Sequence, residues 1–412
     1  MLTPVPTHPT THGNRARVVA MVEFLEASGF EVHVAVLLRE DWDQSAMLEA
    51  YGARLHLIPY VRPLRRESTL QAWVRRGRQL FDPSTRHAYG GDDWYDDATD
   101  RVVERLDREI GFDLAVVEYG FMSRALHKLA SPKLKVIDTH DIFANRHLMF
   151  LQSGMTPSFY STTPDEEKLC LSRADLVLGI QAQETERLRA YGLNAITFGH
   201  TAKIDPVFES TESEFDLLMV GSANAMNVQG LLWFGQEVMP HLALAAPQLR
   251  IAIAGELCHA TPDFHNLKKL AVVPDLKDVY ARTRVVINPV RNGTGLNIKS
   301  IEAMGFGIPL LSTKSGARGL EEAWGAGIEI ADTAEAFAHA ALSLLDDEEG
   351  LRNRSRGALA FAKRWNKRHA EAFTSRLIAA FPGVQSSVMR NEPEHLAVTG
   401  NVRAPEFGVA LK

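Results

Sequence analysis

Short apolar runs alternate along this chain with longer stretches of helical period. This is the pattern expected of strand–helix–strand units that build parallel sheets. A first series predicts strands at 32–38, 55–59, 114–117, 134–137 and 176–178, with amphipathic stretches such as 16–27 between them. A second series predicts strands at 215–220, 249–253, 270–273, 285–288 and 308–312, followed by helices to residue 381. The chain is therefore predicted to be an α/β protein with two Rossmann-like domains that face each other across a cleft.

The stretch 201–214 between the two series has little periodicity and contains Pro206 and four acidic residues, so we expect the interdomain linker there. The predicted domains are 1–203 and 204–381, and we expect the tail 382–412 to be mobile. The residues before His12 leave room for only a very short opening strand, which would be explained by a start codon further upstream.

The composition narrows the class of protein. With 412 residues the chain is long enough for two domains, and its net charge of −6 argues against a nucleic-acid binder driven by bulk charge. The two cysteines, Cys170 and Cys258, are too few for a disulfide framework and lack the spacing of zinc ligands. Because no run of about 18 apolar residues occurs, we expect a cytoplasmic protein without a membrane span.

The most informative segment is 291–311, which reads as glycine loop, short helix, glycine stop and strand. Gly293 and Gly295 would let backbone N–H groups approach an anion, and the helix that follows would add the positive end of its dipole. Lys299 falls in the first turns of this helix, where a cation is disfavoured unless an anion is bound. The loop therefore suits a diphosphate.

Glu302 shares a helical face with Lys299 and can accept hydrogen bonds from vicinal hydroxyls such as those of ribose. The ordinary alternative is a surface ion pair of little energetic weight. The neighbouring glycines and the parallel-sheet context favour nucleotide binding over that alternative.

This segment resembles the donor-binding motif of the GT-B glycosyltransferases of family 4 (glycosyl transferases group 1). In that motif a glycine loop leads to a helix ending in Glu-Ala-Met, then Gly-x-Pro and a strand. The resemblance extends to 215–222, which is similar to the first strand and loop of the family's C-terminal domain, to the helix 227–240, and to 274–280 beside the nucleotide base.

The resemblance implies a nucleotide-sugar donor, with UDP or GDP as the nucleotide, and no cofactor or metal. The donor-binding residues that it implies, together with the loop argument above, are Gly13, Gly221, Ser222, Arg291, Gly293, Gly295, Leu296, Asn297, Lys299 and Glu302. Two positions depart from the family's pattern. Thr294 stands where many retaining members have glutamate, and the Gly221 loop lacks the basic residues that often grip the diphosphate.

Polar residues interrupt the apolar run of the N-terminal domain at 138–141, at the carboxyl end of a predicted strand, where ligands of parallel sheets bind. By resemblance, His140 would touch the donor sugar. Asp141 is a candidate general base for the acceptor hydroxyl if the reaction inverts. A helix cap and a packed histidine are the alternatives. Gly13 follows the short opening strand, and a plain turn explains it almost as well as a phosphate contact.

The stretch 62–81 contains six arginines and one glutamate, with apolar residues on one helical face. It either docks on an anionic membrane or packs on its own sheet. Acidic and aromatic residues at 90–97 predict a loop on the acceptor side.

The sequence thus predicts a metal-independent glycosyltransferase with a glycan or lipid-linked acceptor, located in the cytoplasm or at the inner face of the membrane. Two alternatives remain: a sugar-nucleotide epimerase of the same fold, and an inactive nucleotide-binding subunit. A dinucleotide-dependent oxidoreductase is disfavoured because no strand leads into Gly-x-Gly-x-x-Gly with an acid about twenty residues on.

Overall fold

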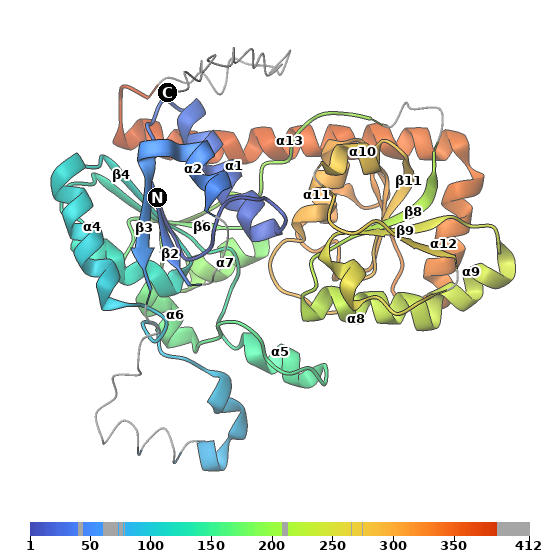
Figure 1. Ribbon diagram of the computed structural model, residues 1–412, viewed down its shortest axis with the longest axis horizontal. Coiled ribbons are helices and arrows are strands. Elements are labelled where there is room, and N and C mark those ends of the chain that lie inside the picture. Colours follow the sequence, from blue (N-terminus) through green and yellow to red (C-terminus); the bar gives the residue numbers. More distant parts are fainter. Residues whose placement is uncertain are drawn as a thin grey trace, which may run out of the picture.

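A computed structural model describes residues 1–39, 44–60, 73, 77, 79–207, 213–264, 266–273 and 275–384 of the chain. These residues form two lobes, each built on one parallel sheet with helices on both faces (Figure 1). The architecture confirms the predicted α/β class with two Rossmann-like domains. None of the helices within the described residues combines the length and apolarity needed to cross a bilayer.

The N-terminal domain contains a seven-stranded sheet in the order β3-β2-β1-β4-β5-β6-β7. Its strands are β1 (Leu2–Thr3), β2 (Val34–Leu38), β3 (Leu55–Pro59), β4 (Leu114–Glu118), β5 (Leu134–Asp138), β6 (Leu176–Gly179) and β7 (Ala195–Thr197). Its helices include α1 (Gly13–Ala27), α2 (Ser45–Tyr51), α4 (Asp97–Ile110), α5 (Arg146–Gln152), α6 (Pro164–Leu171) and α7 (Ala182–Ala190). The strands read as apolar runs because apolar clusters cover both faces of this sheet.

The C-terminal domain contains a six-stranded sheet in the order β10-β9-β8-β11-β12-β13. Its strands are β8 (Phe215–Val220), β9 (Ile251–Ala254), β10 (Leu267–Lys269), β11 (Thr283–Asn288), β12 (Leu310–Ser312) and β13 (Ile328–Ile330). Its helices are α8 (Ala225–Trp233), α9 (Met239–Ala245), α10 (Leu276–Tyr280), α11 (Ile298–Gly305), α12 (Ala334–Asp346) and α13 (Glu348–Ala380), with a π-helical turn, η4 (Phe234–Val238), between α8 and α9.

The predicted strand at 270–273 is wrong. The strand in this part of the chain is β10, which ends at Lys269 and has only three residues. Strands β7 and β13 were not predicted at all. Each has three residues, which is too short for an apolar run to stand out. Both lie at the edge of their sheet.

Helix α13 joins the two domains. It has 33 residues, about 50 Å at 1.5 Å per residue, and Figure 1 shows it running along both lobes. Phe361 and Trp365 lie in the core of the C-terminal domain. Phe373 and Leu377 lie in the core of the N-terminal domain, where Phe373 stacks on Phe24 of α1. The last turns of α13 therefore belong to the N-terminal domain, although the predicted boundaries place them in the other one.

Candidate functional site

The order of strands determines where each sheet can bind a ligand. In an open parallel sheet, ligands bind in a crevice at the carboxyl ends of the strands. The crevice lies between the two neighbouring strands from which the chain proceeds outward in opposite directions. These strands are β1 and β4 in the N-terminal domain and β8 and β11 in the C-terminal domain. Gly221 follows β8, and the glycine loop 292–297 follows β11. The fold therefore brings both predicted donor loops to one crevice.

Lys299 is the cation of this crevice. A Cβ placed on Gly221 would lie 3.3 Å from the Lys299 Nζ, so the ammonium lies directly against the Gly221 loop. Burial lowers the pKa of Lys299 from 10.5 to about 8, although the charge of Glu302 acts in the opposite direction. Within the described residues no side chain or carbonyl forms a hydrogen bond or ion pair with this ammonium. Within the described part of the chain the site thus holds a partly buried cation to which no anion is directly bonded.

Glu302 lies one turn further along α11 and is 3.5 Å from the Nε2 of His200. Its side chain is partly exposed. Burial raises the pKa of the Tyr280 hydroxyl well above 10, and the negative charge of Glu302 adds to this shift. That hydroxyl has no hydrogen-bond partner in the described part of the chain.

The other predicted donor-binding residues surround these two. Gly295 has a φ of +73°, a conformation that favours glycine, and a Cβ there would lie 3.4 Å from the carbonyl of His140. Gly293 lies beside Met226 of α8, Leu296 is buried in the core, and Asn297 precedes α11. Ser222 accepts hydrogen bonds from Asn224 and Asn227. The guanidinium of Arg291 lies over the ring of Trp233.

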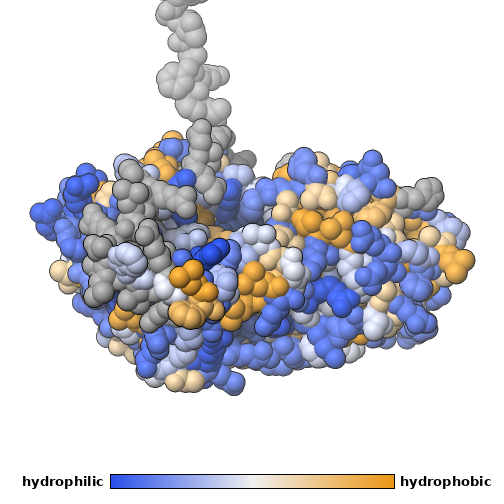
Figure 2. All heavy atoms as spheres, turned by 90° about the horizontal axis from the view of Figure 1, so that it is seen from below, coloured by the Kyte–Doolittle hydropathy of each residue, from blue (hydrophilic) through white to orange (hydrophobic). Residues whose placement is uncertain are grey.

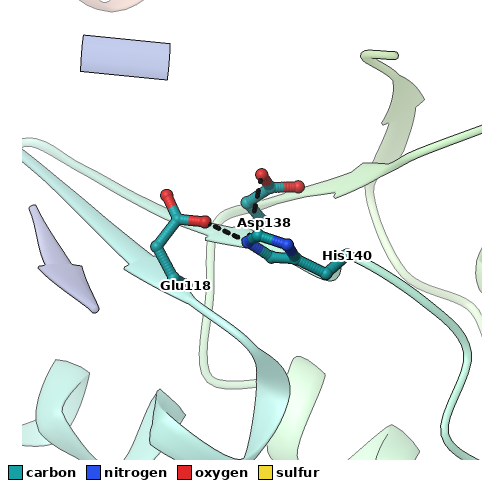
Figure 3. Close-up of side chains that lie close together, drawn as sticks. All are labelled: Glu118, Asp138 and His140. Carbon is teal, nitrogen blue, oxygen red and sulfur yellow. Dashed lines mark hydrogen bonds and ion pairs between the residues drawn. The ribbon is translucent and has the colours of Figure 1, made fainter. Parts of the chain in front are cut away.

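His140 is the central residue on the N-terminal side. Its Nε2 is 2.5 Å from a carboxylate oxygen of Glu118, which ends the neighbouring strand β4 (Figure 3). The ring of Tyr119 stacks on the imidazole at 4.1 Å with an angle of 9°. Both His140 and Tyr119 have positive φ angles, 59° and 71°. Such backbone conformations are costly for residues with side chains and cluster at functional sites.

A buried ion pair fixes the base of this cluster. Arg17 of α1 donates to both oxygens of Asp138, at 2.7 and 2.6 Å, and to the carbonyl of Phe198 at 2.7 Å. Burial, together with the nearby charge of Asp138, raises the pKa of Glu118. Glu118, Asp138 and His140 are close enough for a metal ion to bridge them. However, the guanidinium of Arg17 already binds both oxygens of Asp138, so we interpret the cluster as a hydrogen-bond network.

Asp141 contacts the opposite domain. Its carboxylate accepts a hydrogen bond of 2.5 Å from the hydroxyl of Thr294 and one of 2.8 Å from the N–H of Ile142, and it lies 3.2 Å from Arg146. Burial raises the pKa of Asp141. Burial and the charge of Asp141 raise that of the neighbouring Glu184 well above its ordinary value. In this arrangement of the domains the carboxylate of Asp141 is therefore engaged by Thr294 of the glycine loop.

Further contacts hold the two domains together at the same place. The amide of Gln181 donates to the carbonyl of Gly295 at 3.1 Å. A Cβ on Gly13 would lie 3.4 Å from Ile298, so α1 begins directly against α11. Next to it, His12 lies 3.1 Å from Glu256. The structure thus brings Gly13, His140 and Asp141 against α11 and the glycine loop, whereas the contacts of Ser222 and Arg291 lie within the C-terminal domain.

Glu118, Arg17 and Glu184 belong to this site but were not predicted. A signal for Glu118 was present, because it is a polar residue at the end of the apolar run 114–117, as Asp138 is at the end of 134–137. Arg17 and Glu184 lie on helices among other charged residues. Only the packing of those helices on the sheet places them here.

Residues 214–347 match the family model described as glycosyl transferases group 1. This confirms the resemblance drawn from the sequence for the domain that contains Lys299 and Glu302. A curated relative, the "Uncharacterized 44.6 kDa protein in cps region" of Klebsiella pneumoniae, is 26% identical over 149 residues. The alignment covers 33% of this chain and 38% of the relative's length.

Solved structures resemble the chain over nearly its whole length. Sucrose-phosphate synthase from Thermosynechococcus elongatus superposes with a TM-score of 0.61 at 14% identity, covering 92% of this chain and 98% of that protein. HepE from Anabaena, in a structure with UDP and glucose, gives a TM-score of 0.58 at 14% identity and covers 91% of this chain and 99% of HepE. The chain has the GT-B fold.

Proposed function

We propose that this protein is a glycosyltransferase that moves a sugar from a nucleoside diphosphate donor to an acceptor hydroxyl. The observation that carries the proposal is the Lys299 ammonium at the glycine loop of a glycosyl transferases group 1 domain, which has no hydrogen bond or ion pair within the described residues. A partly buried cation without a bonded partner is costly and is explained by a bound anion. UDP is the first nucleotide to test, since HepE was solved with UDP, and GDP is the second.

The C-terminal domain holds the donor in this proposal. The diphosphate lies between the Lys299 ammonium and the backbone amides of the glycine loop 292–297, at the positive end of α11. As the bond to the sugar breaks, negative charge grows on the leaving diphosphate. These fixed donors stabilise that charge without any reorganisation, and the reaction needs no metal ion.

The N-terminal domain presents the acceptor, a glycan or a lipid-linked glycan. Glu118 fixes the imidazole of His140 through Nε2, so the other ring nitrogen, Nδ1, is left for the substrate. Asp141 is the candidate base for the acceptor hydroxyl, and Thr294 of the opposite domain donates a hydrogen bond to one of its oxygens. Closure of the domains around the substrates excludes water from the reacting centre.

A thermal-shift screen of UDP, GDP and their sugars tests the donor site. We expect one nucleotide to raise the melting temperature of the wild type but not that of Lys299→Met. Lys363→Met, which removes an exposed lysine of α13, is the matched control and should respond like the wild type. Equal stabilisation of wild type and Lys299→Met would contradict the role of Lys299.

The stabilising sugar nucleotide then separates transfer from epimerisation. Incubation with the donor alone should leave the configuration of the sugar unchanged, whereas addition of a glycan acceptor should yield a glycosylated product. An epimer formed without acceptor would contradict the proposal.

The proposed place of action is the cytoplasm or the inner face of the membrane. The predicted docking segment 62–81 lies largely outside the described residues. Its six arginines suit an anionic lipid surface. Flotation with vesicles tests this contact: binding should require anionic lipid, and equal behaviour with neutral vesicles would contradict it.

A further inference from the structure

Arg39 has an unusual environment at the ligand edge of the N-terminal sheet. It follows β2 directly, and its guanidinium carbon lies 4.8 Å from the ring centre of Trp94 and 5.3 Å from that of Tyr60. The side chain is half-buried. Within the described residues its guanidinium forms no hydrogen bond and no ion pair. Two aromatic rings therefore hold a cation whose N–H groups have no acceptor among the described residues.

Other arginines of this domain that lie over aromatic rings are bonded as well. Arg124, over Tyr95, donates to Asp100 at 2.9 Å. Arg146, over Phe150, lies 3.2 Å from Asp141. These two are explained by their carboxylate partners, whereas Arg39 has none in the described part of the domain.

The carboxylates nearest in sequence to Trp94 have their own partners. Asp92 accepts two hydrogen bonds from Arg173, at 2.6 and 2.9 Å. Asp93 accepts from the N–H of Gly90, and Asp96 accepts from the N–H of Ala98 at the start of α4. Within the described residues none of these three carboxylates forms an ion pair with Arg39.

A guanidinium stacked on aromatic rings is well suited to bind an oxyanion. Its N–H groups point outward in the plane of the group and match the two oxygens of a carboxylate or phosphate. Stacking also fixes the side chain in advance, so less rotamer entropy is lost when the anion binds. The protein as a whole is negatively charged, so attraction of an anion requires a local site of this kind.

A line of aromatic rings connects Arg39 with the reacting centre. The ring of Trp94 lies 5.3 Å from that of Phe159, which lies 5.9 Å from Tyr119, and Tyr119 stacks on His140 at 4.1 Å. Phe159 is 41% exposed and has a φ of +66°. A strained backbone that presents an aromatic ring to solvent is a second sign of a binding surface. Figure 2 shows the face viewed from below, on which several separate apolar patches lie among hydrophilic surface.

We propose that Arg39 binds an oxyanion carried by the acceptor, a phosphate or the carboxylate of an acidic sugar. An apolar face of the acceptor lies on Phe159 and Trp94, and its reacting hydroxyl lies at His140. This inference rests on the proposed glycosyl transfer, because it assigns the chemical class of that reaction's acceptor. It predicts a preference for charged saccharides over neutral ones.

Direct binding measurements test the subsite without any donor. The probes are cellobiuronic acid, cellobiose 6′-phosphate and neutral cellobiose, each titrated into the protein to tens of millimolar and followed by NMR. We expect at least one charged probe to bind about tenfold more tightly than cellobiose, the usual effect of a charge-assisted hydrogen-bonded pair. The charged probe that binds distinguishes a carboxylate from a phosphate ligand.

Three variants and a control make the assignment specific. Arg39→Met should reduce the affinity for the charged probe to that for cellobiose. Arg39→Lys should give an intermediate affinity, because lysine keeps the positive charge but lacks the paired N–H donors of the guanidinium. Phe159→Ala should weaken all probes, including the neutral one. Arg352→Met, which removes an exposed arginine of α13, should behave like the wild type.

The proposal is overturned if no charged probe exceeds cellobiose in affinity, or if Arg39→Met binds the charged probe as the wild type does. Nucleotide binding is measured in parallel. A protein that binds a nucleotide but shows no preference for charged saccharides would refute the subsite and leave the transferase proposal intact. A protein that prefers charged saccharides but binds no nucleotide would refute the transferase proposal and leave an anionic-saccharide site.

Discussion

Lys299→Met is expected to stabilise the ligand-free protein while it abolishes diphosphate binding. The lowered pKa of Lys299, about 8 against 10.5, means that folding moves a charged ammonium into a less polar environment. Each pKa unit corresponds to about 1.4 kcal/mol. Because the side chain is partly exposed, solvent screening should leave a cost of about 1–3 kcal/mol. Methionine has a similar length and carries no charge, so it removes this cost.

The pH dependence of the difference follows from the direction of the shift. Below pH 8 the lysine is protonated in both the folded and the unfolded chain, so the full cost is present. As the pH rises from 8 to 10.5, the folded chain loses the proton before the unfolded chain does, and the wild type gains stability relative to the variant. Urea unfolding at pH 7 should therefore show the larger free energy for Lys299→Met, and the gap should close towards pH 10.5.

Nucleotide binding gives the second half of the test. The affinity of the wild type for the stabilising nucleotide should fall by up to about tenfold per pH unit above pH 8, since only the protonated lysine attracts the diphosphate. Lys299→Arg stays charged over this range and should lose that dependence. A Lys299→Met variant that is less stable than the wild type at pH 7, or that still binds the nucleotide, would refute the reasoning.

Three further substitutions test the contacts of the N-terminal domain. Arg17→Met leaves the buried carboxylate of Asp138 without its cation and should cost about 3–5 kcal/mol in urea unfolding. Adding Asp138→Asn should restore part of this loss, and no recovery would contradict the ion-pair explanation. Glu118→Gln should lower kcat by about 10- to 100-fold with the KM for the donor unchanged, because the imidazole of His140 loses its fixed orientation. A change in KM alone would contradict a positioning role. Thr294→Val removes the hydrogen bond to Asp141 and should lower the free energy of unfolding by about 1–3 kcal/mol. Amide hydrogen exchange around Asp141 should become faster. Unchanged exchange would show that this contact does not hold the domains together.

The sequence predicted the long central strands well because their apolar runs are buried on both faces of a sheet. Strands 55–59 and 215–220 have the predicted bounds, whereas the edge strands β7 and β13, with three residues each, carry no comparable signal. The glycine loop and α11 were also predictable, since glycines, a helix start and a glycine stop follow one another within 291–311. The partners of Asp138 and Asp141 were not, because Arg17 and Thr294 lie more than a hundred residues away from the carboxylates that they contact.

Several features that are costly for the fold coincide at this one place. Within the described residues, buried polar atoms of Gln181, Glu184 and His200 at the contact between the domains have no hydrogen-bond partner, and neither does one oxygen of Glu118 beside His140. The Lys299 ammonium, which has no hydrogen bond or ion pair within the described residues, lies in the crevice of the C-terminal domain. Proteins satisfy nearly all buried polar groups, so each exception requires an explanation, and their clustering requires a common one. Under the proposed function, a donor that brings a diphosphate and several hydroxyls would offer partners to Lys299 and to the polar groups at the contact between the domains.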